Sequence, residues 1–283
     1  CSSDLMKTAS AMLLVSLVAA AFALPSLAEG SSDSGPEFYF TRLIYSGGGG
    51  FYSANASPKL GTERSCESLA RGEGGEGGGR LGSWATDYPA SDCKFMWGVE
   101  RLSGVRVYDQ TPHSVTIMDP NLFKFPYLYV VEAGRGMELS KQEVERLREF
   151  LLRGGFMHWD DFWGLRQKDN VEYQLKKIFP EYAMAPLDLK EEVFHTFFDV
   201  EKVVQIPNVN NGCNGGRTWE QADDTEPRIY GIKDEKGRLM VVITYNSDLG
   251  DAWEWMDAPC YPEVYSSQAY KMGLNFIVYA FSH

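Results

Sequence analysis

Residues 127–161 read YLYVVEAGRGMELSKQEVERLREFLLRGGFMHWDD, and this stretch decides the fold. It begins with a short, continuous apolar run at 127–131, which is typical of a buried parallel strand. Ser140 and Glu143 then form a capping box, because each side chain can satisfy a free amide at the start of a helix. The first half of the stretch therefore predicts a strand followed by a helix.

The second half of the stretch predicts another strand. The glycine pair at 154–155 ends the helix, and the apolar residues 156–159 form a strand that ends at Asp160 and Asp161. Residues 170–179 again have a helical pattern. Strand, helix, strand and helix in succession imply a parallel sheet with crossover helices.

The rest of the chain adds elements on both sides of this unit. We expect a first strand at 37–45, a short helix near 91–102, two strands at 228–232 and 239–245 around a hairpin turn, and a long helix at 266–281. Together these predict a single α/β domain over 37–283, with a glycine-rich surface loop at 46–82.

Residues 1–28 predict export. After Met6 and Lys7, residues 8–28 carry no charge, and small residues at 26 and 28 precede Glu29, as in a secretory signal peptide. We interpret residues 1–5 as an upstream mis-start and 29–36 as a linker. An N-terminal membrane helix is the alternative, against which the proline at 25 argues. The prediction is a periplasmic or extracellular protein without stable membrane insertion after cleavage.

Composition narrows the class of partner. The 283 residues carry 27 Lys+Arg against 39 Asp+Glu, a formal charge of −12, so nucleic acid and anionic membrane surfaces are not expected as main partners. A hydrophobic share of 44% is enough to bury a core. After signal cleavage Cys66, Cys93, Cys213 and Cys260 remain. They permit two disulfides in three connectivities, with Cys66–Cys93 and Cys213–Cys260 as the favoured pairs, and free buried thiols are the alternative.

Several catalytic motifs are excluded or weak. The G-x-G-x-x-G match at 72–77 lacks a preceding strand and a following helix, so it does not predict a dinucleotide site. The chain contains no G-x-S-x-G elbow and no H-E-x-x-H zinc motif. The usual serine hydrolases and zinc proteases are therefore not expected.

Two acidic segments are the candidate site. Ligands of doubly wound sheets bind beyond the carboxyl ends of the strands, where Asp160 and Asp161 follow His158. Two adjacent carboxylates could ligate a hard cation, act as acid and base, or bind a polar ligand. A second cluster after a strand combines carboxylates with tryptophans, a common lining of sugar and cation sites, and comprises Asp248, Asp251, Trp253 and Trp255. The alternatives are a structural turn and a loop whose tryptophans cover the core.

The two aspartates at 160 and 161 are expected to play different parts. Side chains alternate across a strand, so only one of the pair can face the cleft if strand geometry continues. The other is expected to turn toward the next helix and cap its amides.

Five blocks of the chain are similar to one family. Residues 84–89, 125–129, 154–161, 246–255 and 273–283 resemble the bacterial domain-of-unknown-function family 4159. The resemblance implies a class I glutamine amidotransferase-like fold, a flavodoxin-like three-layer sandwich, and no established activity. Asp87, in the first block, joins the candidate binding residues. Catalytic amidotransferases carry a cysteine at the turn that matches Asp160, so thiolate chemistry and glutaminase activity are not expected here. The same match implies that Asp160 is the aspartate that faces the cleft, and we therefore predict that Asp161 caps the amides of the next helix.

These observations predict an exported, non-glutaminase domain that binds an unknown polar ligand or an envelope protein. No cofactor is predicted, although a divalent cation is compatible with the aspartates. The alternatives are an aspartate-dependent, metal-assisted or metal-free hydrolase of a glycan or other polar substrate, and a structural subunit of an envelope assembly. Whether the protein is an enzyme stays open at this point.

Overall fold

A computed structural model describes residues 38–47, 66, 82–108 and 112–283, all within the unit Gly35–His283. The predicted signal peptide, the linker, the motif at 72–77 and most of the predicted loop at 46–82 lie outside the described residues. No helix in the described ranges combines the length and the apolar character that a membrane span needs.

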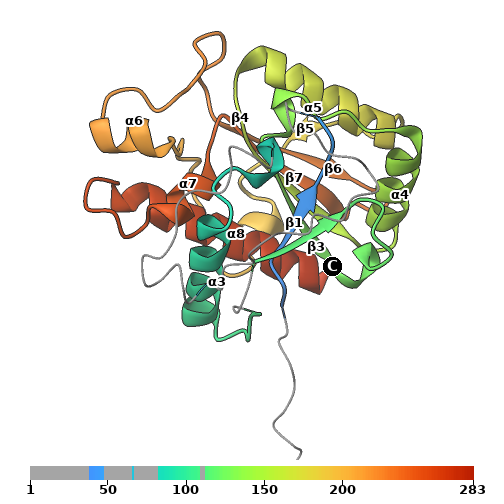
Figure 1. Ribbon diagram of the computed structural model, residues 1–283, viewed down its shortest axis with the longest axis horizontal. Coiled ribbons are helices and arrows are strands. Elements are labelled where there is room, and N and C mark those ends of the chain that lie inside the picture. Colours follow the sequence, from blue (N-terminus) through green and yellow to red (C-terminus); the bar gives the residue numbers. More distant parts are fainter. Residues whose placement is uncertain (1–37, 48–65, 67–81, 109–111) are drawn as a thin grey trace, which may run out of the picture. The chain divides into compact units, whose positions relative to one another are not determined.

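Seven strands form one sheet in the order β2-β1-β3-β4-β7-β6-β5 (Figure 1). Their bounds are β1 Thr41–Ile44, β2 His113–Thr116, β3 Tyr127–Val131, β4 Phe156–Phe162, β5 Ala185–Pro186, β6 Arg228–Lys233 and β7 Leu239–Tyr245. The first five strands in this order are parallel, whereas β6 is antiparallel to β7 and β5 is antiparallel to β6. The predicted parallel sheet is confirmed, and β7 lies beside β4 within it.

Helices cover both faces of the sheet. Their bounds are α3 Ala90–Ser103, α4 Lys141–Leu152, α5 Gly164–Ile178, α6 Val209–Asn214, α7 Leu249–Glu254 and α8 Glu263–Ser282, with 3-10 turns η1 Ser83–Ala85, η2 Leu122–Lys124, η3 Ala133–Arg135 and η4 Glu192–Phe194. Helices α3, α7 and α8 pack on one face, and α4 and α5 pack on the other (Figure 1). The result is a three-layer α/β sandwich.

The pleat of β3 divides the core between these two layers. Tyr127, Tyr129 and Val131 belong to the cluster under α3, α7 and α8, whereas Leu128 and Val130 belong to the cluster under α4 and α5. Both faces of the strand are therefore buried, which explains why its sequence is a continuous apolar run instead of an alternating one. Strands β4 and β7 are likewise buried along their whole length.

The predicted capping box is present at the start of α4. The Ser140 amide donates to Glu143 Oε2 at 2.8 Å, and the Glu143 amide donates to Ser140 Oγ at 3.3 Å. Four predicted boundaries are wrong: β1 begins at Thr41, β4 continues to Phe162, α5 begins at Gly164 and α8 begins at Glu263. The apolar pattern could not mark the end of β4, because its last residues include two buried aspartates.

Two disulfides join elements on the α3 and α8 side. Cys66 pairs with Cys93, and Cys213 pairs with Cys260. These are the two pairs that the sequence favoured, so free thiols at these four positions are excluded. The Cys66–Cys93 bond attaches residue 66 to α3, and the Cys213–Cys260 bond ties α6 to the segment between α7 and α8.

Candidate functional site

The carboxyl ends of β3, β4 and β7 meet at one edge of the sheet, because these strands are parallel neighbours. Glu132 directly follows β3, Asp161 lies near the end of β4, and Asp248 follows β7 by three residues. This edge is where open α/β sheets bind their ligands. The topology thus brings carboxylates from three distant parts of the sequence to one place.

The backbone turns sharply at this edge. Within the described ranges, the non-glycine residues with a left-handed backbone are Asp87, Glu132, Asp161 and Asn246, with φ of 59°, 51°, 53° and 53°. This conformation costs about 1–2 kcal/mol for an ordinary L-residue, and such costs concentrate at functional sites. Three of the four residues follow or end a central strand. The local strain therefore accompanies the placement of polar side chains at the sheet edge.

Three aspartates form the centre of the site, and we call them the aspartate triad: Asp87, Asp161 and Asp248. One carboxylate oxygen of each lies within 4.8 Å of the others. Asp161 and Asp248 are buried, with exposed fractions of 3% for both, and Asp87 is half-buried. Asp87 Oδ2 is itself fully buried and accepts no hydrogen bond from a described residue. Such an oxygen is costly unless a ligand completes it.

A second carboxylate group shares Asp87. It comprises Asp87, Asp251 and Glu254, whose oxygens also lie within 4.8 Å of one another. Asp251 and Glu254 belong to α7, the short helix that follows β7. Asp87 thus belongs to both groups and connects the triad with the two carboxylates of α7.

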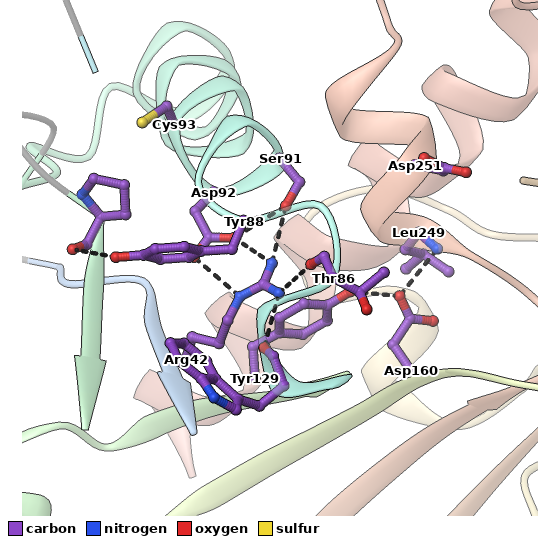
Figure 2. A network of polar contacts seen from close by, with 12 residues as sticks. Arg42, Thr86, Tyr88, Ser91, Asp92, Cys93, Tyr129, Asp160, Leu249 and Asp251 are labelled. Atoms are coloured by element: carbon purple, nitrogen blue, oxygen red, sulfur yellow. Dashed lines mark hydrogen bonds and ion pairs between the residues drawn. The ribbon is translucent and has the colours of Figure 1, made fainter. Parts of the chain in front are cut away.

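Arg42 holds the segment that carries Asp87. Its guanidinium is fully buried on β1 and donates to both carboxylate oxygens of Asp92, to the carbonyls of Trp84 and Thr86, and to Ser91 Oγ (Figure 2). These acceptors lie on both sides of Asp87 in the sequence. One buried cation therefore fixes the loop from 84 to 92 and orients Asp87.

Two aromatic rings enclose the same guanidinium. Its central carbon lies 5.5 Å from the ring centre of Tyr88 and 5.2 Å from that of Tyr129, both within cation–π range. Burial opposes the charged form of Arg42, but the charge and hydrogen bond of Asp92, together with Tyr129 and Asp87, outweigh this and raise the pKa of Arg42. The arginine stays charged in the folded protein.

Asp161 and Asp248 are fixed by hydrogen bonds within their own turns. Trp163 Nε1 donates to Asp161 Oδ1 at 2.7 Å. Asp248 is the N-cap of α7, where its Oδ1 accepts from the Asp251 amide at 2.8 Å. Gly250 leaves room for Asp87, because a Cβ at position 250 would lie 2.4 Å from Asp87 Oδ2. The three carboxylates are thus preorganised without a ligand.

Burial and mutual repulsion dominate the electrostatics. Desolvation, followed by the charges of neighbouring carboxylates, raises the pKa of Asp87, Asp161 and Asp248 well above the usual range. Glu132 also has a raised pKa because of burial, although Arg135 pairs with it at 2.7 Å and counteracts the shift. Arg42 already forms an ion pair with Asp92, so it does not neutralise the aspartates of the triad. The described part of the site therefore holds several carboxyl groups whose ionisation is unfavourable without a counterion.

Asp160 and Asp161 have parts opposite to those predicted. Asp160 is fully buried and accepts from Tyr129 Oη at 2.7 Å, from the Leu249 amide at 3.0 Å and from Thr244 Oγ1. Asp161 does not cap the next helix, since the N-cap of α5 is Trp163, which has no side-chain cap. The left-handed backbone at Asp161 breaks the strand alternation on which the prediction depended. Asp161 belongs to the triad, whereas Asp160 accepts a hydrogen bond from Leu249, the first residue of α7.

His158 belongs to the interior together with Asp160. Its Nδ1 lies 3.0 Å from Tyr127 Oη and its Nε2 lies 3.0 Å from Thr244 Oγ1. Burial lowers the pKa of His158 to about 3, so the ring is neutral. Because Thr244 donates its single proton toward Asp160, Nε2 is the protonated nitrogen of His158 and Nδ1 accepts from Tyr127. The hydrogen bonds of His158 therefore connect β3, β4 and β7 in the interior of the protein.

We expect Asp160→Ala to destabilise the protein by about 2–3 kcal/mol, because three buried donors would lose their acceptor. Asp160→Asn should cost only about 1 kcal/mol. Its remaining oxygen can still accept from Tyr129 and Leu249, while Thr244 can donate to the Trp159 carbonyl at 3.2 Å. Urea unfolding followed by circular dichroism measures both changes. Equal costs for the two variants would show that these hydrogen bonds do not set the stability at this position.

The two tryptophans of the second cluster differ in their environment. Trp253 is fully buried and stacks on Phe95 with ring centres 4.0 Å apart, so it belongs to the core. Trp255 is partly buried, and its amide donates to the Asp251 carbonyl at 2.8 Å. Of the pair, Trp255 is the one that contacts the acidic residues.

Sequence reasoning missed several residues of the site. Arg42 is a charged residue inside an apolar strand, and Glu132 directly follows the buried run at 127–131, as Asp160 and Asp161 follow the next one. Both signals were present in the sequence. Glu254 lies within the predicted second cluster but was not singled out.

Comparison with known proteins identifies a family for this chain. The model of a family described as a domain of unknown function, DUF4159, matches residues 75–281. No curated protein matches the chain. The matched range contains all three residues of the aspartate triad.

Proposed function

The chain belongs to the DUF4159 family of domains of unknown function, and we propose that it binds a divalent cation at the aspartate triad and, through that cation, a polar ligand rich in oxygen. The observation that carries the proposal is the convergence of Asp87, Asp161 and Asp248, whose oxygens lie within 4.8 Å of one another. The unpartnered Oδ2 of Asp87 adds to it.

A hard cation resolves the electrostatic problem of the site. Buried carboxylates repel one another and lose their hydration, and an ion such as Ca²⁺ or Mg²⁺ takes oxygen ligands and offsets both costs. Three protein carboxylates do not fill six or more coordination positions. The remaining positions would be available to water or to the hydroxyl, carboxyl or phosphate oxygens of a ligand.

The proposed setting is an exported, amidotransferase-like domain of the flavodoxin type. Two disulfides support export, since such bonds persist in oxidising compartments. The parallel sheet with helices on both faces supports the fold type. Position 160, which matches the amidotransferase elbow, holds a buried aspartate instead of a cysteine, so the proposal does not include glutaminase chemistry.

The test is cation binding measured by titration calorimetry after dialysis against a chelator. We expect one site for Ca²⁺, Mg²⁺ or Mn²⁺, which stabilises the protein by about 2.7 kcal/mol at a free cation concentration of 100 times its dissociation constant. Asp161→Asn should weaken binding at least about tenfold, because an amide nitrogen or a neutral oxygen replaces a charged ligand.

A matched control distinguishes a site from general electrostatics. Asp169→Asn removes the same charge from an exposed position on α5 and should leave cation affinity unchanged. In the chelator-treated protein, Asp161→Asn should also raise the melting temperature, because it removes one of several buried like charges. Equal affinities for the Asp161 and Asp169 variants would contradict the proposal.

A second candidate is a cation-assisted hydrolase. It is favoured by the sharing of Asp87 between the triad and the Asp251–Glu254 pair, which would place two further carboxylates beside the cation for proton transfer. Asp251→Asn would then abolish hydrolysis of a responsive glycan or ester while cation affinity changes little. Absence of turnover across such substrates, with cation binding intact, favours the binding domain instead.

A further inference from the structure

A cavity of about 420 Å³ lies between α3 and α8 and shares no residue with the aspartate triad (Figure 1 shows the two helices). Its walls are mainly apolar. They include Leu102 on α3, Tyr270 on α8, and Phe198 and Met256 from the connecting segments. Gly98 keeps α3 close to α8 here, because a Cβ at position 98 would lie 2.0 Å from the Tyr270 ring. The volume falls within the range of about 300–1,000 Å³ that is typical of small-molecule sites.

Ser266 gives this cavity an unsatisfied polar group. The residue lines the cavity, is 5% exposed, and its Oγ makes no hydrogen bond to a described residue. A serine in a helix often donates to the carbonyl four positions earlier, but this one does not. A buried hydroxyl without a partner is costly, and a ligand oxygen that accepts from it would remove that cost.

Two cations lie at the margin of the same cavity. Arg101 and Lys271 line it, are exposed, and form no ion pair within the described ranges. The neighbouring carboxylate of Asp257 is already paired with Lys94 at 2.5 Å. On a chain with a formal charge of −12, two unpaired cations beside one apolar cavity form a local positive site.

We propose that this cavity binds a single-chain anionic amphiphile, represented by a medium-chain carboxylate. The alkyl chain packs against Leu102, Phe198, Met256 and Tyr270. The carboxylate is attracted by Arg101 and Lys271, and it accepts a hydrogen bond from Ser266 Oγ once rotation of that side chain turns the enclosed hydroxyl toward the cavity. An apolar wall with a few polar groups is the usual composition of a site for such a ligand.

The test is titration calorimetry with decanoate below its micellar concentration. Decanoate should bind with a stoichiometry of one, whereas decanol and decyltrimethylammonium should bind at least about tenfold more weakly, because they lack the negative charge. Ser266→Ala should weaken decanoate binding by about threefold to tenfold, the effect of one hydrogen bond. It should also raise the melting temperature of the free protein, because the unpaired hydroxyl is removed.

Leu102→Glu and Leu152→Glu form a matched pair. Both leucines are 50% exposed, but Leu102 lines the cavity and Leu152 lies on α4, on the other face of the sheet. Leu102→Glu should weaken decanoate binding at least about tenfold through repulsion and lost packing, and Leu152→Glu should leave it unchanged. Equal effects of the two variants would overturn the proposal. So would equally tight binding of the cationic amphiphile, or self-association of the protein that Leu102→Glu abolishes, which would identify a second copy as the occupant.

Discussion

Replacement of Arg42 by methionine is expected to destabilise the protein by about 3–5 kcal/mol, the range for breaking a buried ion pair from one side. Arg42 and Asp92 both have an exposed fraction of 0%, so the variant leaves the Asp92 carboxylate buried without a cation. The carbonyls of Trp84 and Thr86 lose a donor as well. Urea unfolding monitored by tryptophan fluorescence measures the loss of stability.

Two further variants separate the buried pair from ordinary surface pairs. Arg42→Met combined with Asp92→Leu should recover part of the stability, because no uncompensated charge is left. Arg148→Met, which breaks the partly exposed pair with Glu181, should cost less than about 1 kcal/mol. A loss of stability in the Arg42 variant as small as in the Arg148 variant would contradict the central part that we assign to Arg42.

The same substitution connects stability to the site. Arg42 holds the backbone at Trp84 and Thr86 and the side chains of Ser91 and Asp92 (Figure 2). Asp87 lies between these contacts in the sequence. Arg42→Met should therefore weaken cation binding even at temperatures where the protein is folded. The residue contributes through the position of Asp87, since its own charge is balanced by Asp92.

The sequence predicted the parts of the fold whose burial is visible locally. The apolar run at 127–131 and the capping box at Ser140 and Glu143 appear in the structure as β3 and the start of α4. The pairing of β4 with β7 was not predictable in this way, because it joins residues about 85 positions apart, Trp159 and Ile243 among them, and no local pattern encodes it.

The site was predicted in its residue types but not in its geometry. Asp87, Asp161 and Asp248 were all candidates, yet the sequence assigned the cleft to Asp160. The error came from the assumption of regular strand geometry, which the left-handed backbone at Asp161 violates. An aspartate is one of the few non-glycine residues that adopt this conformation readily. Its presence is therefore compatible with the turn but does not predict it.

The stability of the protein without a bound cation is expected to depend on pH. Without divalent cations, the free energy of unfolding should fall as pH rises from about 4.5 to 7.5. Asp87, Asp161 and Asp248 have folded-state pKa values above their unfolded ones, so between those values the folded protein binds more protons than the unfolded chain. Their stabilising contribution is complete below the unfolded pKa of about 3.9 and is lost as pH rises through the folded pKa.

The pKa of Asp160 indicates how large this change in the free energy of unfolding is for one buried aspartate. Burial raises its pKa from 3.8 to about 6, and the corresponding loss of stability across that interval is about 3 kcal/mol. His158 acts in the opposite direction, because burial lowers its pKa from 6.5 to about 3 and the unfolded chain binds its proton over part of the same interval; it is one group against the three aspartates of the triad. Glu138, Glu181 and Asp224 also oppose the trend, since hydrogen bonds and ion pairs lower their pKa values. These three groups are near the surface, so solvent screening keeps their contribution small.

A saturating divalent cation should reverse this trend. Carboxylates bind a cation in their charged form, so the stabilisation by the cation grows with pH while the intrinsic stability of the site declines. Urea unfolding at several pH values, with chelator and with Ca²⁺ or Mg²⁺, should give curves that diverge toward neutral pH. Asp161→Asn should flatten the slope in chelator and remove the divergence. If the chelator-treated protein instead gains stability steadily from about pH 4.5 to 7.5, the buried aspartates do not carry the unfavourable charge that makes this edge of the sheet a cation site.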